Sequence, residues 1–159
     1  MTDDLLLILT LFAALGCGLV AGVFFAFSTF VMAGLGRLRP EQGIASMQSI
    51  NVTAISPVFM TALFGTAVAC IVLAISSLFR LGDARVIYLL AGSGLYLIGV
   101  VLVTIIFNLP RNDALAAVDP ASDEGARLWA SYLDTWTAWN HVRTITGLAA
   151  TAAFILALR

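Results

Sequence analysis

The chain has 159 residues, of which 61% are hydrophobic and only 11% charged, whereas an ordinary soluble domain has about 25% charged residues. The net charge is -1 and every basic residue is an arginine, so there is no cationic stripe that could neutralise a nucleic-acid backbone. The composition therefore excludes a water-soluble globule and a nucleic-acid partner. It predicts an integral membrane protein whose main partner is the lipid bilayer.

Uncharged stretches predict where the chain crosses the membrane. Residues 5–36, 51–79 and 86–110 are each longer than the roughly 20 helical residues that a bilayer core requires. The last stretch, residues 144–158, is too short, so the final helix must also use the residues before Thr144. We expect an all-α integral membrane four-helix bundle in one domain, with spans at about 5–34, 54–79, 85–108 and 136–158.

The segments between the spans carry their own signals. Pro40 and the apolar spacing that follows it predict a short interfacial helix over about 40–50. The polar segment around Pro110 is expected to break the third span. A turn near Pro120 and helical spacing beyond it predict a long helix 4, whose extension over about 121–135 leads into the last span.

Polar side chains concentrate on one side of the membrane, which we call the site side. The end of span 1, the start of span 2, the end of span 3 and the start of span 4 all lie there. The residues concerned are Ser28, Arg37, Asn51, Asn108, Asn112, Asn140, His141 and Arg143. Arginines near the span ends also favour this side, so the positive-inside tendency predicts that it faces the cytoplasm, in a bacterial inner membrane.

The start of span 4 carries the candidate chemistry. Trp136 and Trp139 are expected at the headgroup level, which would place His141 and Arg143 within the bundle. Ionisable groups at such depth are costly and are functional candidates. His141 could be a general base or a haem ligand, or else an interfacial histidine bonded to a helix carbonyl. A lone histidine excludes a multi-histidine metal centre.

Arg143 has two interpretations. It either snorkels toward the headgroups or is buried, where Asn108, Asn112 or a ligand oxygen would have to accept its hydrogen bonds. A buried guanidinium would stabilise a phenolate or enolate as its charge develops. Helical periodicity puts Asn140 and Arg143 on one face and His141 on another, and both faces can point inward only if neighbours surround the helix.

The other candidate residues would line a pocket for a small, flat and apolar aromatic ligand. Phenylalanines at the end of span 1 would form an apolar wall that opens on the site side. The predicted substrate-binding residues are Phe24, Phe27, Ser28, Asn51, Trp136 and Trp139.

Three motifs resemble a known family. They are Gly22-Val23-Phe24-Phe25-Ala26-Phe27-Ser28, Asn108-x-Pro110-x-Asn112 and Trp136-x-x-Trp139-Asn140-His141-x-Arg143-Thr144. Together they resemble the anthrone oxygenase family of small four-helix membrane proteins, over nearly the whole chain. Ala33 and Arg111 depart from the pattern, which bears on the shape of the loops.

The resemblance implies an oxygenase that converts a polyketide anthrone to an anthraquinone with molecular oxygen, without a required cofactor. An anthrone enolises easily, so His141 would remove a proton while Arg143 and Asn140 hold the oxyanion. Asn108 and Asn112 complete the catalytic set that we predict.

Two other hypotheses stay open. In the first, the protein binds haem as an enzyme or a sensor, with His141 as the axial ligand. In the second, it is a non-catalytic membrane subunit that forms a homo-oligomer through the Gly18-x-x-x-Gly22 face of helix 1.

Overall fold

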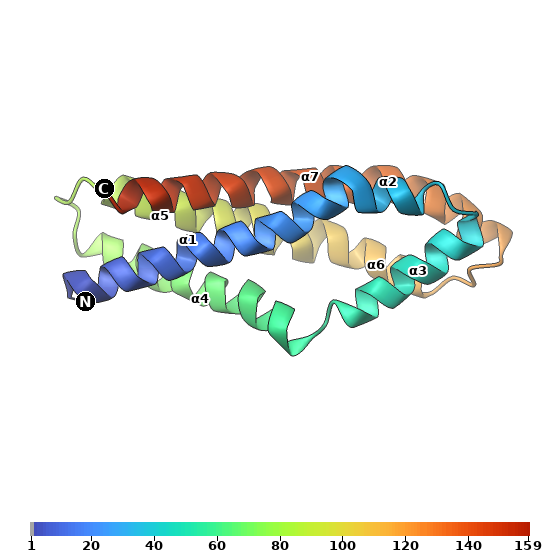
Figure 1. Cartoon of the computed structure of the whole chain (residues 1–159), viewed down its shortest axis with the longest axis horizontal. Coiled ribbons are helices and arrows are strands. Elements are labelled where there is room, and N and C mark those ends of the chain that lie inside the picture. The colour runs from blue at the N-terminus through green and yellow to red at the C-terminus, as the bar shows by residue number, and fades with distance from the viewer. Residues whose placement is uncertain (1) are drawn as a thin grey trace.

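The computed structural model describes residues 2–159, and within this range the chain is all-helical, with no strand. The elements in order are α1 (Asp3–Ala26), η1 (Phe27–Val31), α2 (Met32–Leu35), α3 (Pro40–Thr53), α4 (Pro57–Leu78), α5 (Val86–Tyr96), η2 (Leu97–Leu102), η3 (Thr104–Asn108), α6 (Leu109–Ala116) and α7 (Asp123–Ala157). The η elements are short π-helical stretches inside longer rods. The helices run lengthwise beside one another, with both termini at the same end (Figure 1).

Three of the helical rods are long and apolar enough to cross a membrane. They cover Asp3–Leu35, Pro57–Leu78 and Val86–Ala116, and they are typical of an integral membrane protein. The described residues form five rods, because α3 and α7 join these three, so the predicted count of four helices is not confirmed. The first turns of α7 carry acidic residues, and α7 is not among the three apolar rods.

Local chemistry explains where several helices begin. Pro40 and Pro57 occupy first-turn positions of α3 and α4, where the missing N–H costs no hydrogen bond. Ser56 caps α4 by accepting a hydrogen bond from the Phe59 N–H at 3.3 Å. Ser122 caps α7 in the same way, at 2.9 Å from the Gly125 N–H. The rod α3 covers more than the expected 40–50, and α7 lies close to the expected 121–158.

The expected break at Pro110 is wrong. The rod passes through this residue and ends at Ala116. A proline in a helix interior lacks an N–H donor and crowds the preceding turn, and here the π-helical stretch Thr104–Asn108 comes directly before it. The Arg111 side chain donates a 2.6 Å hydrogen bond to the carbonyl of Phe107, which gives that carbonyl a partner.

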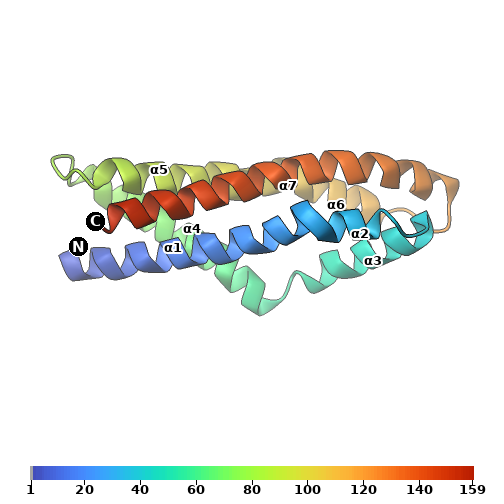
Figure 2. The same ribbon diagram turned by 45° about the horizontal axis from the view of Figure 1, so that its top comes forward.

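Two apolar clusters hold the rods together. The larger lies between α1, α4, α5 and α7 and includes Val20, Leu73, Tyr96 and Phe154. The smaller joins α2, α3, α6 and α7, and Trp129 is one of its members. Helix packing is close, since a Cβ on Gly43 would lie 2.8 Å from the Trp129 ring. Figure 2 shows this second group of helices extending beyond the N-terminal end of α4.

Glycines of helix 1 also pack within the chain. A Cβ on Gly18 would lie 3.6 Å from the Thr151 side chain of α7, whereas no atom of the described residues lies within 4 Å of one on Gly22. Of the two glycines of the Gly18-x-x-x-Gly22 face, Gly18 therefore packs against α7 within the protein.

Ion pairs tie the helix ends together on the side opposite to the site side. Asp3 and Arg80 form an ion pair at 2.6 Å that links α1 to the end of α4. Asp83 accepts hydrogen bonds from the Arg85 side chain and backbone, and these bonds lower the pKa of Asp83 to about 2.

Candidate functional site

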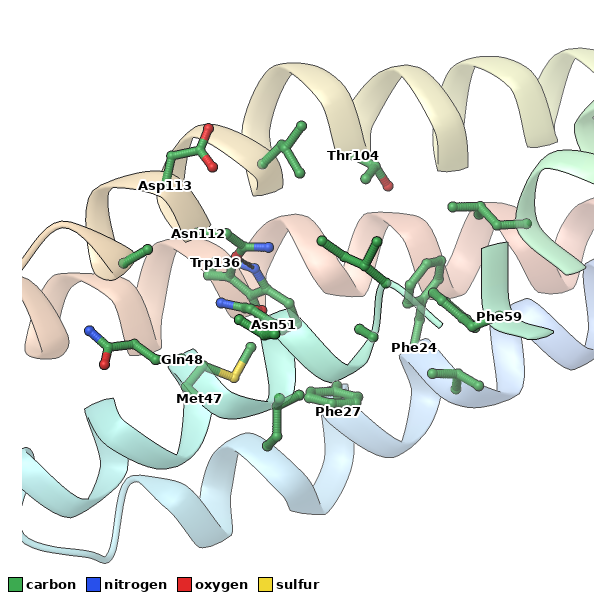
Figure 3. Close-up of a pocket in the computed structure, with 18 of the residues that line it drawn as sticks. Phe24, Phe27, Met47, Gln48, Asn51, Phe59, Thr104, Asn112, Asp113 and Trp136 are labelled. Carbon is green, nitrogen blue, oxygen red and sulfur yellow. Dashed lines mark hydrogen bonds between the residues drawn. The ribbon is translucent and has the colours of Figure 1, made fainter. Parts of the chain in front are cut away.

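A cavity of about 450 Å³ lies on the site side, among α1, η1, α3, α4, η3, α6 and α7. We call it the Arg143 cavity. Aromatic and aliphatic side chains form most of its wall, among them Phe24, Phe27, Met47, Ile50, Phe59 and Leu63. Its polar lining residues are Gln48, Asn51, Thr104, Asn112, Asp113, Trp136 and Arg143. In Figure 3, Asn51, Asn112 and Trp136 lie close together, and Phe24 and Phe59 lie together at the other end.

Arg143 is buried, with 4% of its surface exposed, although it is a charged residue. One terminal nitrogen donates to Asn140 Oδ1 at 2.7 Å, and the other donates to Thr104 Oγ1 at 3.2 Å. The guanidinium carbon lies 4.1 Å from the centre of the Phe24 ring and 5.1 Å from that of Trp136, within the range of cation–π attraction. The structure thus supports the buried interpretation of Arg143 and not the snorkelling one.

No carboxylate forms an ion pair with Arg143 among residues 2–159. Its Nε is buried and has no hydrogen-bond partner in the described part of the chain. The Nδ2 of Asn51, another residue of the cavity wall, is buried, and within the described residues it approaches only the Tyr132 hydroxyl. Buried donors usually have partners, so the Arg143 guanidinium is a buried cation whose hydrogen-bonding capacity the described residues meet only in part.

Asn140 fixes the guanidinium in place. It is fully buried, and its Nδ2 donates to the Phe24 carbonyl and to Ser28 Oγ, each at 2.7 Å. Its Oδ1 is therefore oriented toward Arg143. The Thr144 hydroxyl lies 3.1 Å from Ser28 Oγ and donates to the Asn140 carbonyl at 2.9 Å. This network joins α1, η1 and α7 and holds one rotamer of the arginine.

Asn112 orients the aromatic side of the cavity. Its Oδ1 accepts hydrogen bonds from the Tyr132 hydroxyl and from Trp136 Nε1, both at 2.8 Å. The Trp136 ring lies 5.8 Å from the Phe27 ring, centre to centre, and is nearly parallel to the Tyr132 ring. The flat faces of these rings suit a planar aromatic ligand.

The prediction that His141 faces the bundle interior is wrong. Its side chain is exposed, and it does not line the Arg143 cavity. Residues two apart lie about 200° apart around a helix, so once Arg143 points inward, His141 points outward. It shares an exposed stripe of α7 with Asp134, Ala138, Ile145 and Leu148. The exposed imidazole is therefore not placed to bind a haem inside the bundle.

Two other predicted residues lie near the cavity but do not line it. Asn108 is buried and donates to the Trp136 carbonyl at 3.2 Å, so it fastens η3 to α7. Trp139 stacks on Phe107, with the ring centres 3.5 Å apart. The structure thus brings Phe24, Phe27, Asn51, Asn112, Trp136 and Arg143 to the cavity wall, and Asn140 and Ser28 behind Arg143.

Sequence reasoning missed most of the remaining wall, including three residues that bear on its chemistry. Thr104 bonds to Arg143, Phe59 packs edge-to-face on Phe24 at 6.4 Å, and Asp113 lies at the exposed rim. Thr104 and Phe59 lie within long apolar spans, where the sequence pattern does not distinguish a cavity-lining residue from its neighbours. Asp113 could have been noticed, because it adjoins the Asn112 motif.

The described residues contain no group of three His, Cys, Asp or Glu side chains that could hold a metal ion. Cys17 and Cys70 are free and buried. What the cavity provides is one buried cation, amide groups and aromatic walls, which together can hold a flat molecule with an oxygen that carries negative charge.

Comparison with protein families gives a match over much of the chain. The family model described as "Anthrone oxygenase" matches residues 57–153, more than half of the chain. This range contains the Asn108 and Trp136 motifs but not the motif at the end of α1. No curated protein and no solved structure matches the chain significantly.

Proposed function

The chain belongs to the anthrone oxygenase family, and from this premise we propose that it oxidises an enolisable polycyclic aromatic substrate with molecular oxygen in the Arg143 cavity. The observation that carries the proposal is the buried Arg143 guanidinium, which has no carboxylate partner in residues 2–159 and borders an apolar cavity. Family membership alone does not fix a substrate, whereas the chemistry of this cavity limits which molecules can bind in it.

An anionic ligand would supply what Arg143 lacks. Removing a guanidinium from water costs several kcal/mol unless an opposite charge or good hydrogen bonds compensate. Asn140, Thr104 and the Phe24 ring compensate in part. An enolate oxygen in the cavity would add a charge-assisted hydrogen bond, and it would be stabilised more strongly than the neutral ketone from which it forms.

The reaction that we propose uses this difference. The ring CH₂ loses a proton, and the resulting enolate is held at its oxygen by Arg143. The electron-rich carbon then forms a bond to dioxygen, and the peroxide that results loses water to leave a carbonyl. One CH₂ group and one dioxygen thus become one ketone and one water, and the carbon is oxidised by four electrons while dioxygen is reduced.

The proton needs an acceptor other than His141. We assign this role to Asp113 of α6, the one carboxylate among the described residues of the cavity wall. Its side chain is exposed at the rim, so a proton taken from the substrate can pass on to water.

We also propose that α7 is the fourth membrane-crossing helix. Its second half exposes Ile145, Leu148 and Ile155, with exposed fractions of 67%, 48% and 50%. Such a stripe suits contact with acyl chains. In this arrangement the Arg143 cavity opens toward the cytoplasm, as the arginine distribution favours. A reporter fused after Arg159 should lie outside the cytoplasm, and a cytoplasmic reporter would contradict this orientation.

The direct test is oxygen consumption by the purified protein in lipid nanodiscs with a hydroxylated anthrone. We expect an initial rate far above that of empty nanodiscs, with one dioxygen consumed for each anthraquinone formed. A rate equal to that of empty nanodiscs would overturn the proposal for this substrate class.

A further inference from the structure

The helices α3 and α4 meet at an apex that stands away from the rest of the bundle. Thr53 ends α3 and Pro57 begins α4, because a proline cannot continue the helix before it. The apex lies apart from α1 and α7 in both views (Figures 1 and 2). The side chains of the apex are apolar and largely exposed: Val52 is 74% exposed, Ile55 72% and Val58 82%.

A second hollow lies under this apex. It has a volume of about 310 Å³, and we call it the junction groove. Five side chains line both the groove and the Arg143 cavity, so the two hollows meet there. The shared residues are Val23, Phe27, Ile50, Ala54 and Phe59.

The chemistry of the junction groove differs from that of the cavity. None of its described lining residues is ionisable, and its own two residues are Ser49 and Thr53. The Thr53 hydroxyl donates to the Ser49 carbonyl at 2.9 Å, so it is satisfied within α3. Apart from the Ser49 hydroxyl, the groove therefore offers an apolar surface, which fits a hydrocarbon chain and not a second polar ring.

The position of the groove points to the bilayer. The 22 residues of α4 span about 33 Å, which matches a hydrocarbon core of about 30 Å. The first turn of α4, with its exposed Val58, then lies at the boundary between headgroups and acyl chains. A molecule dissolved in the membrane can reach the groove from the side without leaving the apolar layer.

We propose that the ligand of the Arg143 cavity is a membrane-dissolved amphiphile, whose ring carries the anionic oxygen and whose hydrocarbon chain lies in the junction groove. This inference rests on the proposed function for the ring site. It adds the class of substrate, an alkyl-bearing polycyclic enol or phenol, and its route of entry under the α3–α4 apex.

The test compares two non-reacting ligands, a hydroxylated anthraquinone and the same ring bearing an octyl chain. Affinities are measured in nanodiscs from ligand fluorescence, with empty nanodiscs subtracted. Thr53 lines the groove and not the cavity, so in Thr53→Trp a bulky side chain enters the groove from a position outside the cavity wall. We expect Thr53→Trp to weaken binding of the octyl ligand about tenfold, the value of roughly two buried methylenes, and to change binding of the plain ring less than about twofold.

Two further variants keep the result interpretable. Ser49→Trp fills the groove from the preceding turn of α3 and should give the same selective loss, so a folding defect in one variant does not decide the outcome. Val68→Trp, on an exposed position of α4 that lines neither hollow, is the matched control and should change neither affinity.

Equal effects of Thr53→Trp and Ser49→Trp on both ligands, or no effect on either, would overturn the inference and leave the ring site intact. The same holds if only binding of the plain ring weakens. If the wild-type protein binds neither ligand, the proposed function itself fails, and the inference fails with it.

Discussion

Replacing Arg143 by methionine removes the charge and nearly preserves the length of the side chain. The substitution deletes the 2.7 Å bond to Asn140 and the 3.2 Å bond to Thr104. Each of these two losses costs about 1.5–3 kcal/mol, because the donor is charged. They are offset because no charge then has to be buried, a relief of several kcal/mol. We therefore expect the stability of the variant in nanodiscs to stay within about 2 kcal/mol of wild type.

Activity should respond differently. Loss of one group that stabilises a developing oxyanion costs roughly 100- to 1,000-fold in kcat. The assay is the initial rate of oxygen uptake with a hydroxylated anthrone, together with thermal unfolding of the same sample. Arg111→Met is the matched control, because Arg111 bonds to Thr135 and to the Phe107 carbonyl outside the cavity. A rate for Arg143→Met equal to that of Arg111→Met would refute the reasoning.

Four further substitutions test separate parts of the account. His141→Ala should keep the wild-type oxidation rate within about twofold, because the imidazole is exposed and outside the cavity. An inactive but well-folded variant would instead support His141 as the catalytic base. Asn140→Leu should lower the free energy of unfolding by about 1–3 kcal/mol and abolish most activity, since two buried hydrogen bonds and one partly buried one disappear; unchanged thermal unfolding would count against the network. Asp113→Asn should slow oxidation about tenfold or more at saturating substrate while ligand affinity changes little, whereas a wild-type rate would exclude it as the proton acceptor. Gly43→Ala should destabilise by about 1–3 kcal/mol, because the new Cβ meets the Trp129 ring at 2.8 Å, and a stabilised protein would show that the ring can move.

The sequence predicted the apolar rods well, because the length of an uncharged stretch is a direct consequence of bilayer thickness. It failed at Pro110, where helix continuity depends on a π-helical stretch and on the Arg111 side chain, which bonds to the Phe107 carbonyl. The start of α3 could be predicted because Pro40 stands at a helix N-terminus. The angle between α3 and α4, which forms the groove, depends on tertiary packing that no local pattern records.

The site was predicted in part for a similar reason. Helical spacing separates the face with Asn140 and Arg143 from the face with His141, but spacing alone does not say which one points inward. The structure settles the choice through the Asn140 bonds to Phe24 and Ser28. These bonds join segments that are more than 100 residues apart in the chain, so they could not be read from neighbouring residues.

The central claim is that Arg143 holds the ligand as an anion. It is tested most directly by the absorption spectrum of a hydroxylated anthraquinone bound to the protein in nanodiscs, recorded across a pH series, because its phenol and phenolate differ in colour. The account predicts that the bound ligand ionises at a clearly lower pH than the ligand in empty nanodiscs, and that Arg143→Met abolishes this shift. A bound ligand that stays neutral over the same range as in empty nanodiscs would contradict it.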